Sequence, residues 1–160
     1  MLFQVDELRI RRGIPGDAPS IAGFNAAMAR ETEHLELDAT RLRAGVDAVL
    51  ADPAKGFYLV AENEDRRVVG QLMITFEWSD WRNGVFWWIQ SVYVDPAARG
   101  AGVYRRLYQH VRQAAADAGN VCGLRLYVER ENTRAQEVYR RQGMRATAYD
   151  MYEVDFVIDR

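Results

Sequence analysis

The sequence predicts a single α/β (α+β) domain over residues 1–160, in which a mixed, mostly antiparallel sheet of six to seven strands carries four helices on its two faces. Three observations support this prediction. The length of 160 residues suits one compact core. Segments with the period of strands and of helices follow one another in the order βααβββαβαβ. Three of the strands are consecutive, as in antiparallel hairpins, whereas helices separate the later strands.

The N-terminal part of the chain is predicted to form one strand and two helices. Apolar and charged residues alternate over residues 8–11, and the polar turn at 15–17 leads into apolar residues at helical spacing over 21–28. Asp38 is placed to cap a second helix, which the proline at position 53 should end. The segment between these helices is the most acidic part of the chain.

The middle of the chain has the composition of a β-sheet. β-Branched and aromatic residues dominate three segments, at residues 57–62, 66–78 and 85–94, and polar turns separate them. A helix with an apolar stripe follows over residues 103–118, and Gly119 suits the position just after it.

Three shorter elements complete the predicted order. A strand is expected over residues 123–129, and Asn132 is placed to cap a short helix that ends at Gly143. Apolar and polar residues then alternate over residues 148–156, which predicts a terminal strand.

Composition disfavours several classes of protein. The 21 Lys and Arg residues stand against 23 Asp and Glu, so no overall positive field favours nucleic acid. No apolar run approaches a membrane span, and the short apolar start does not resemble a signal peptide. The single cysteine, Cys122, has no second thiol for a disulfide, zinc or redox site. We therefore expect a cytoplasmic protein that binds no nucleic acid, membrane or metal.

The most informative segment is a strand, a glycine turn and the start of a helix, over residues 91–107. The first N–H groups of a helix have no intrahelical acceptor and carry a partial positive charge, so this arrangement favours a phosphate group. Gly100 and Gly102 allow the backbone to approach that phosphate closely. The Lys-Ser/Thr pair of a P-loop is absent, and Arg105 stands where the dinucleotide pattern needs a third glycine. A tight turn without a ligand is the alternative for these glycines.

Two ordered motifs resemble one known family. Arg-Gly-Ala-Gly at 99–102 follows a strand that ends in Val-Tyr-Val-Asp-Pro, and the segment ENTRAQEVYRRQGM occupies residues 131–144. Together they resemble the GNAT superfamily of acetyl-coenzyme A (acetyl-CoA) dependent N-acetyltransferases, including its diamine- and histone-type members. The resemblance spans nearly the whole chain, because the element order also matches, and its most specific part runs from Trp87 to Met144. Tyr104 departs from the family pattern at a place often held by glycine.

The resemblance implies how acetyl-CoA is held. The diphosphate is assigned to the backbone amides of Arg99, Gly100, Ala101, Gly102, Val103 and Tyr104. The pantetheine arm is assigned to main-chain groups of the preceding strand, at Val92, Tyr93 and Val94. Asn132 matches the family asparagine that contacts the coenzyme, and Tyr139 matches the tyrosine beside the thioester sulfur. A phenol with a pKa of about 10 stays protonated at neutral pH and is able to donate to a thiolate. The alternative for Tyr139 is a tyrosine packed in the core.

The acceptor amine must lose a proton, because an alkylamine with a pKa of about 10.4 is protonated at pH 7. Diamine-type relatives carry a glutamate where this chain has Gln90, which is unable to act as a base. The candidate bases are therefore Glu77, Glu31 and Glu33, although a solvated acidic face is the alternative for the last two. The residues expected at the acceptor site are Glu31, Glu33, Trp81 and Gln90, and they favour a small cationic amine or a lysine side chain.

These residues favour direct transfer of an acetyl group from acetyl-CoA to a primary amine in a ternary complex. Gln90 in the place of a base supports an alternative, a catalytically inactive acyl-CoA-binding sensor or assembly module. A third interpretation is another phosphate-binding α/β protein. The expected partner is a small-molecule amine or a lysine-containing acceptor, and a homodimer is compatible with the fold.

Overall fold

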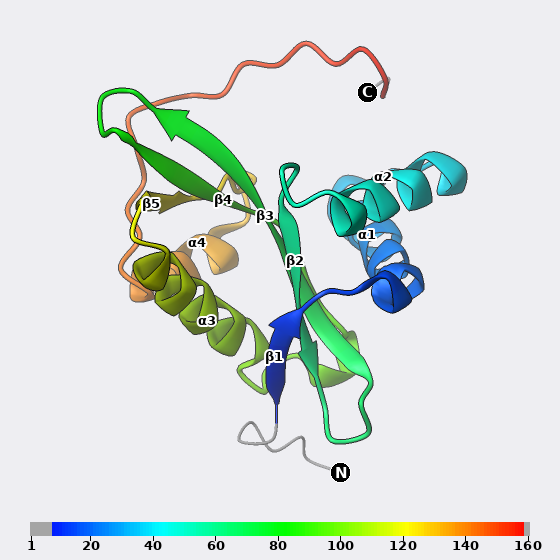
Figure 1. Ribbon diagram of the computed structural model, residues 1–160. Coiled ribbons are helices and arrows are strands. Elements are labelled where there is room, and N and C mark those ends of the chain that lie inside the picture. Colours follow the sequence, from blue (N-terminus) through cyan, green and yellow to red (C-terminus); the bar gives the residue numbers. More distant parts are fainter. Residues whose placement is uncertain (1–7, 159–160) are drawn as a thin grey trace. The chain divides into compact units, whose positions relative to one another are not determined.

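A computed structural model describes residues 8–158 of the chain (Figure 1). The chain divides after Leu126 into two compact units. The first unit contains the sheet and helices α1, α2 and α3, and the second contains α4. Residues 1–7, which hold the short apolar start, lie outside the described residues, as do residues 159–160.

One five-stranded sheet forms the centre of the first unit, in the order β1-β2-β3-β4-β5. Its strands are β1 (Arg9–Arg12), β2 (Phe57–Glu62), β3 (Val68–Ser79), β4 (Gly84–Val94) and β5 (Val121–Arg125). The first four strands pair antiparallel with their neighbours, and β5 pairs parallel with β4. The predicted mixed, mostly antiparallel sheet is confirmed in this respect.

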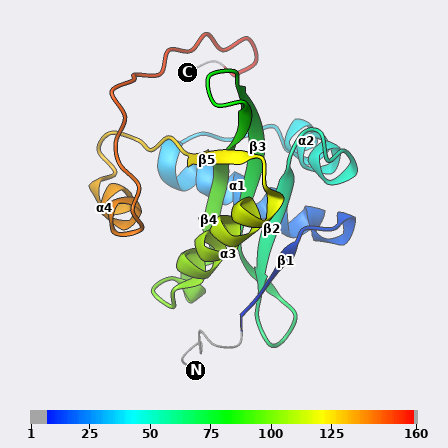
Figure 2. The same ribbon diagram turned by 60° about the vertical axis from the view of Figure 1, so that its left-hand side comes forward.

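Helices cover both faces of this sheet. α1 (Ala18–Glu33) and α2 (Ala39–Ala51) lie together on one face, and α3 (Val103–Ala118) lies on the other (Figures 1 and 2). Successive residues of a strand point to opposite faces, and β3 shows the two faces directly.

Two adjacent residues of β3 face the two layers of helices. A Cβ atom added at Gly70 would lie 2.7 Å from Val103 Cγ1 of α3. Its neighbour Gln71 points the other way, and its Nε2 donates to Asn25 Oδ1 of α1 at 2.8 Å. The start of α3 and the middle of α1 are thus held to the same stretch of sheet from opposite sides.

Side chains set the predicted helix boundaries. Asp38 Oδ1 accepts a hydrogen bond from the Arg41 N–H at 2.7 Å and so caps the start of α2. The same helix ends before Asp52, as predicted. Gly119 follows α3 in the left-handed conformation, with a φ of 75°.

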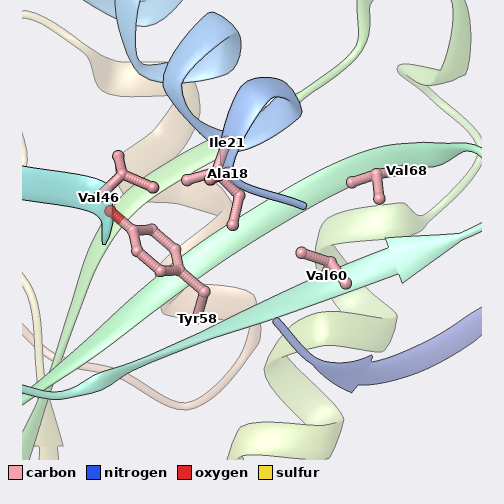
Figure 3. Packing of buried hydrophobic residues seen from close by; sticks show 6 residues of the cluster. All are labelled: Ala18, Ile21, Val46, Tyr58, Val60 and Val68. Atoms are coloured by element: carbon pink, nitrogen blue, oxygen red, sulfur yellow. The ribbon is translucent and has the colours of Figure 1, made fainter. Parts of the chain in front are cut away.

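A core of apolar side chains fills the space between the first two helices and the sheet (Figure 3). Its buried members are Ala18, Ile21, Val46, Tyr58, Val60 and Val68. Full burial of a valine or isoleucine side chain contributes about 1.5–3 kcal/mol. The ring of Phe24 on α1 extends this contact to β4, because it lies 5.1 Å from the ring of Tyr93.

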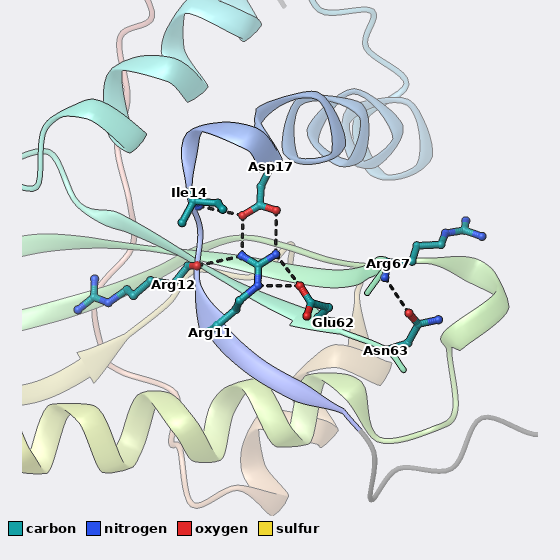
Figure 4. A network of polar contacts seen from close by, with 7 residues as sticks. All are labelled: Arg11, Arg12, Ile14, Asp17, Glu62, Asn63 and Arg67. Carbon is teal, nitrogen blue, oxygen red and sulfur yellow. Dashed lines mark hydrogen bonds and ion pairs between the residues drawn. The ribbon is translucent and has the colours of Figure 1, made fainter. Parts of the chain in front are cut away.

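A partly buried arginine, Arg11, ties the start of α1 to the first two strands (Figure 4). Arg11 Nη1 and Nη2 donate to the two carboxylate oxygens of Asp17 at 2.7 and 3.0 Å, and Nε donates to Glu62 at 2.8 Å. Asp17 also accepts from the Ile14 N–H at 2.8 Å. Burial acts to raise the pKa of Asp17, but the hydrogen bonds from Arg11 and Ile14 outweigh it, so the net pKa is lowered.

The second unit differs from the prediction. It contains α4 (Thr133–Arg141), none of whose residues is buried, and the terminal strand predicted over residues 148–156 does not form. The large apolar side chains of that segment are exposed, at Tyr149, Met151, Tyr152, Val154 and Phe156. Alternation is not sufficient for a strand, which also needs the N–H and C=O groups of a partner strand.

The prediction of six to seven strands is therefore wrong, and the described residues form five, in the order βααβββαβα. β5 is also shorter than predicted, because it ends at Arg125 and not at residue 129. Over residues 8–158, no helix has the length and apolar character of a membrane span.

Candidate active site

β4 contains a β-bulge near its C-terminal end. The pairing with β3 shifts by one residue between Gln71 and Met73, so two residues of β4, Ser91 and Val92, face Leu72. Ser91 has a φ of 51°, which is uncommon for a residue other than glycine. A bulge bends its strand and locally disrupts the ladder. The end of β4 therefore turns away from the line that its first residues follow.

β4 loses its pairing with β5 before the bulge, whereas its pairing with β3 continues to Val94. β5 pairs with β4 from Val85 to Trp88, and β5 itself ends at Arg125. The last residues of β4, up to Val94, have no strand beside them on this edge among the described residues. An unpaired edge presents N–H and C=O groups that an extended ligand is able to bond.

The main chain of Val94 faces this edge. Its carbonyl accepts a hydrogen bond from Arg99 Nε at 3.0 Å, whereas the N–H of the next residue, Asp95, donates to Val69 O of β3 at 2.9 Å. Val92 lies two residues earlier, within the bulge, and Tyr93 between them points its ring toward α1. Of the main-chain groups assigned to the pantetheine arm, the Val94 carbonyl is therefore already engaged.

The glycine turn has left-handed backbone at both glycines. Gly100 has a φ of 83° and Gly102 a φ of 76°. The Arg99 N–H donates to Pro96 O at 3.3 Å, and the Ala101 N–H donates to Ala98 O at 3.4 Å. These two amides, which the resemblance assigns to the diphosphate, are thus used within the turn. The backbone groups that remain available for a diphosphate therefore begin at the two glycines.

The N-terminus of α3 has no side-chain cap. Gly102 is its N-cap, and the first backbone bond of the helix is donated by Arg106 N to Gly102 O at 3.1 Å. The helix therefore supplies no acceptor for the N–H groups of Gly102, Val103 and Arg105. Tyr104, half-buried, packs along the helix with its ring 6.2 Å from that of Tyr108.

An ion-pair network connects the turn to α1. Glu31 Oε2 accepts from Arg99 Nη2 at 2.8 Å, and Glu31 Oε1 accepts from the Tyr93 hydroxyl at 2.7 Å. These hydrogen bonds, from Tyr93 first and Arg99 second, lower the pKa of Glu31. Burial and the bond to Glu31 raise the pKa of Tyr93. Glu31 is thus the candidate base nearest the bulge, and it is held as a paired carboxylate.

Two other predicted residues lie further along the sheet on the α1 side. Gln90 Nε2 donates to Thr75 Oγ1 across the strands. Glu77 lies opposite Phe86, and its carboxylate pairs with Arg125 of β5. Phe86 is five positions from the bulge, which is about 16 Å along a strand.

The remaining acceptor candidates are at the periphery of the first unit. Glu33 is the last residue of α1 and is exposed. Trp81 lies in the turn between β3 and β4 and is 83% exposed. This turn is about 20 Å from the bulge along β4, so Trp81 does not line the region of the bulge.

The second unit holds the last two predicted residues. Asn132 is the N-cap of α4, and its Oδ1 accepts from the Ala135 N–H at 3.1 Å. Tyr139 is half-buried in the same helix, and burial raises its pKa above the usual value. Neither the first nor the second unit, over residues 8–158, contains a group of three or more His, Cys, Asp or Glu side chains able to hold a metal ion.

Comparison with known proteins identifies the family of this arrangement. A model of the acetyltransferase (GNAT) family matches residues 24–144, which covers the glycine turn and α4. The chain belongs to the GNAT family. The division after Leu126 falls inside the matched region, so the family pattern extends over both units.

Two curated relatives of this GNAT chain are mycothiol acetyltransferases. The protein from Mycolicibacterium gilvum is 33% identical over 96 residues, which are 58% of this chain and 30% of the relative. The protein from Mycolicibacterium vanbaalenii is 29% identical over 146 residues, 87% of this chain and 46% of the relative. The chain thus spans less than half the length of either relative.

Solved structures share the fold over nearly the whole chain. A possible acetyltransferase from Clostridium difficile 630 is 43% identical, covers 94% of this chain and 99% of its own, and has a TM-score of 0.87. A predicted acetyltransferase from Clostridium acetobutylicum, crystallised with acetyl-CoA, has a TM-score of 0.74 at 18% identity, covering 92% and 96% of the two chains. At that identity, the second likeness shows the fold alone.

Sequence reasoning missed a buried polar group beside the bulge of this GNAT chain. Gln71 is fully buried, and its Nε2 also donates to Ser91 O at 3.3 Å. Asn25, its partner on α1, is buried and donates to the Tyr58 hydroxyl at 3.5 Å. The available signal was an amide side chain within an otherwise apolar strand, because buried polar groups need partners.

Proposed function

We propose that this protein transfers an acetyl group from acetyl-CoA to a primary amine, by direct attack in a ternary complex. The observation that carries the proposal is the uncapped N-terminus of α3, reached through two left-handed glycines and next to the unpaired edge of β4. This pairing of an anion-binding helix end with an open strand edge suits a ligand that has a diphosphate at one end and an amide-rich arm at the other.

The residues present fit acetyl-CoA. The N–H groups of Gly102, Val103 and Arg105 precede the first intrahelical bond of α3, and each charge-assisted N–H contact contributes about 1.5–3 kcal/mol. No side chain caps this turn, because both glycines lack a Cβ. Acetyl-CoA, when bound, supplies an activated thioester that an amine is able to attack.

We assign the strand edge to the pantetheine arm and to the acetyl carbonyl. Main-chain groups at Val92 and the N–H of Val94 are the candidates to bond the arm, because the Val94 carbonyl is engaged by Arg99. Backbone N–H groups at the bulge would stabilise the oxyanion that develops on the carbonyl. We assign Tyr139, which matches the family tyrosine, to protonation of the departing thiolate; burial raises the pKa of this phenol, so it is protonated at neutral pH.

The amine proton needs an acceptor near the bulge, and we favour Glu31 over Glu77 and Glu33. The Glu31 carboxylate bonds the Tyr93 hydroxyl, and Tyr93 directly follows the bulge. Presenting a neutral alkylamine at pH 7 costs about 5 kcal/mol, so a carboxylate that receives the proton directly or through water is useful. The acidic end of α1 also favours a cationic acceptor, a small amine or a lysine side chain.

The alternative function is an inactive acyl-CoA-binding module. Gln90 supports this alternative, because its side chain occupies the place of a base in diamine-type relatives. Its amide nitrogen donates a hydrogen bond to the Thr75 hydroxyl. Such a module would bind the coenzyme as a sensor or an assembly subunit and would not transfer the acetyl group.

Release of free thiol from acetyl-CoA distinguishes the two functions. The acceptor panel comprises polyamines, amino acids, aminoglycosides, a lysine peptide and the acceptor of mycothiol acetyltransferases. We expect release with at least one amine and calorimetric binding of acetyl-CoA without any amine. Binding without release across the panel would favour the inactive module. Stabilisation by nucleotides but not by coenzyme A would remove both in favour of another phosphate-binding protein.

A further inference from the structure

Arg99 contacts α1 and directly precedes the glycine turn. Its Nη2 donates to Glu31 at 2.8 Å, and its Nε donates to the Val94 carbonyl at 3.0 Å. The next residue, Gly100, begins the turn to which the proposed function assigns the coenzyme diphosphate. One guanidinium therefore lies within reach of both the helix on the acceptor side and the coenzyme turn.

Each carboxylate oxygen of Glu31 already accepts a hydrogen bond in this arrangement. One oxygen is bonded by the Tyr93 hydroxyl and the other by Arg99, and the positive charge of Arg99 favours the ionised carboxylate. The same bonds lower the pKa of Glu31. A carboxylate in this state is a poor base for the amine.

The Glu31–Arg99 pair is exposed and therefore easily exchanged. The two side chains are 42% and 47% exposed, whereas Tyr93 is buried. An exposed ion pair contributes little, because water screens it. A diphosphate carries more charge than a carboxylate, and the planar guanidinium binds phosphate oxygens well.

We propose that the coenzyme diphosphate competes with Glu31 for Arg99, so that coenzyme binding releases Glu31 to accept the amine proton. This inference rests on the proposed function and adds an order of binding to it. The coenzyme binds first and prepares the base, and without it the carboxylate stays paired. Because coupling between two sites is reciprocal, removal of the Glu31 charge must tighten coenzyme binding.

A different role for Glu31 gives the opposite result. If Glu31 only holds Arg99 and the turn in place, its loss frees the loop, and coenzyme affinity falls. The sign of the change in affinity therefore separates competition from support.

Calorimetric titration with acetyl-CoA tests the sign. We expect Glu31→Gln to bind acetyl-CoA about three- to fivefold more tightly than wild type at low salt, and less so at high salt. Glu36→Gln is the matched control, because Glu36 is also an exposed carboxylate near the end of α1 but pairs with Arg30 at 3.7 Å. Its affinity should change by less than about twofold. Unchanged or weaker binding in Glu31→Gln would overturn the proposal.

Arg99→Gln provides a second test of this competition. In that background Glu31→Gln should no longer tighten acetyl-CoA binding, since the guanidinium for which Glu31 and the diphosphate compete is absent. With the best amine of the panel, Glu31→Gln should lower both kcat and the KM for acetyl-CoA, whereas loss of a supporting contact would raise this KM. Tightening that persists without Arg99 contradicts the competition. Wild-type protein that binds no acetyl-CoA overturns the proposed function and this inference together, whereas binding that Glu31→Gln leaves unchanged overturns the inference alone.

Discussion

Helices α3 and α4 both begin at residues that the sequence assigns to the coenzyme, but their first turns are completed differently. α3 begins at Gly102, which is left-handed and has no side chain to bond the turn. α4 begins at Asn132, whose Oδ1 accepts from the Ala135 N–H at 3.1 Å. A helix start without a cap keeps its N–H groups for a ligand, whereas a capped start has already used one of them.

The two helices also differ in how they are held. Val103, Leu107 and Val111 of α3 are at most 2% exposed, so the sheet determines where its N-terminus lies. α4 has no buried residue. We therefore expect substitutions at α3 to act on coenzyme binding and substitutions at α4 to act on turnover or local stability.

The strongest test of this difference is Gly102→Asp. Aspartate tolerates left-handed backbone and is a good N-cap, so the helix should form, but its carboxylate would take the amides and repel the diphosphate. We expect acetyl-CoA affinity to fall at least about a hundredfold in calorimetry, with a nearly unchanged melting temperature. Gly102→Asn, which caps without charge, should lose less. Unaltered affinity in the aspartate variant would contradict binding of the diphosphate by the amides at the start of α3.

Tyr139→Phe tests the other half of the comparison. If Tyr139 is the acid, turnover should fall about ten- to a thousandfold while calorimetric affinity for acetyl-CoA stays the same. The required form is the protonated phenol, and burial raises its pKa, so the alkaline loss of wild-type turnover that is due to Tyr139 should begin above the usual tyrosine range. Wild-type turnover in this variant would eliminate the acid role.

Gly70→Val tests whether the sheet places the α3 amides. A Cβ at this position would lie 2.7 Å from Val103 Cγ1, so the first turn of α3 must shift. We expect a loss of about 1–3 kcal/mol in the free energy of unfolding, measured by urea denaturation, and weaker coenzyme binding. Gly45→Val is the control, because a Cβ there meets no atom within 4 Å apart from its chain neighbours and the backbone of its own helix. Equal effects at both positions would contradict the placement.

The smallest expected effect is that of Asn132→Ala. Loss of this cap should cost the start of α4 about 1 kcal/mol, visible as faster amide exchange at Ala135. Asn132→Asp keeps an oxygen for the cap but removes the amide donor, so it isolates any contact with the coenzyme. If both variants bind acetyl-CoA like wild type, Asn132 is a structural cap only.

Local features of the chain were predictable because neighbouring residues decide them. The cap at Asp38, the end of α2 before Asp52 and the cap at Asn132 follow from side chains bonding amides a few positions away. The two glycines before α3 are left-handed for a similarly local reason, since they lack a Cβ. The family resemblance rested on these same short segments.

Contacts between distant segments were decided by the tertiary structure. The alternating residues 148–156 do not make a strand, because alternation specifies a face and not a partner. The bulge at Ser91 depends on its register with β3, and the pairing of Glu31 with Arg99 joins residues 68 positions apart. A carboxylate in an acidic segment is equally able to be a solvated charge or a base, and only the folded chain brings Tyr93 and Arg99 to its two oxygens. The sequence determined which groups are available, and the packing of α1 against β4 decided which of them meet.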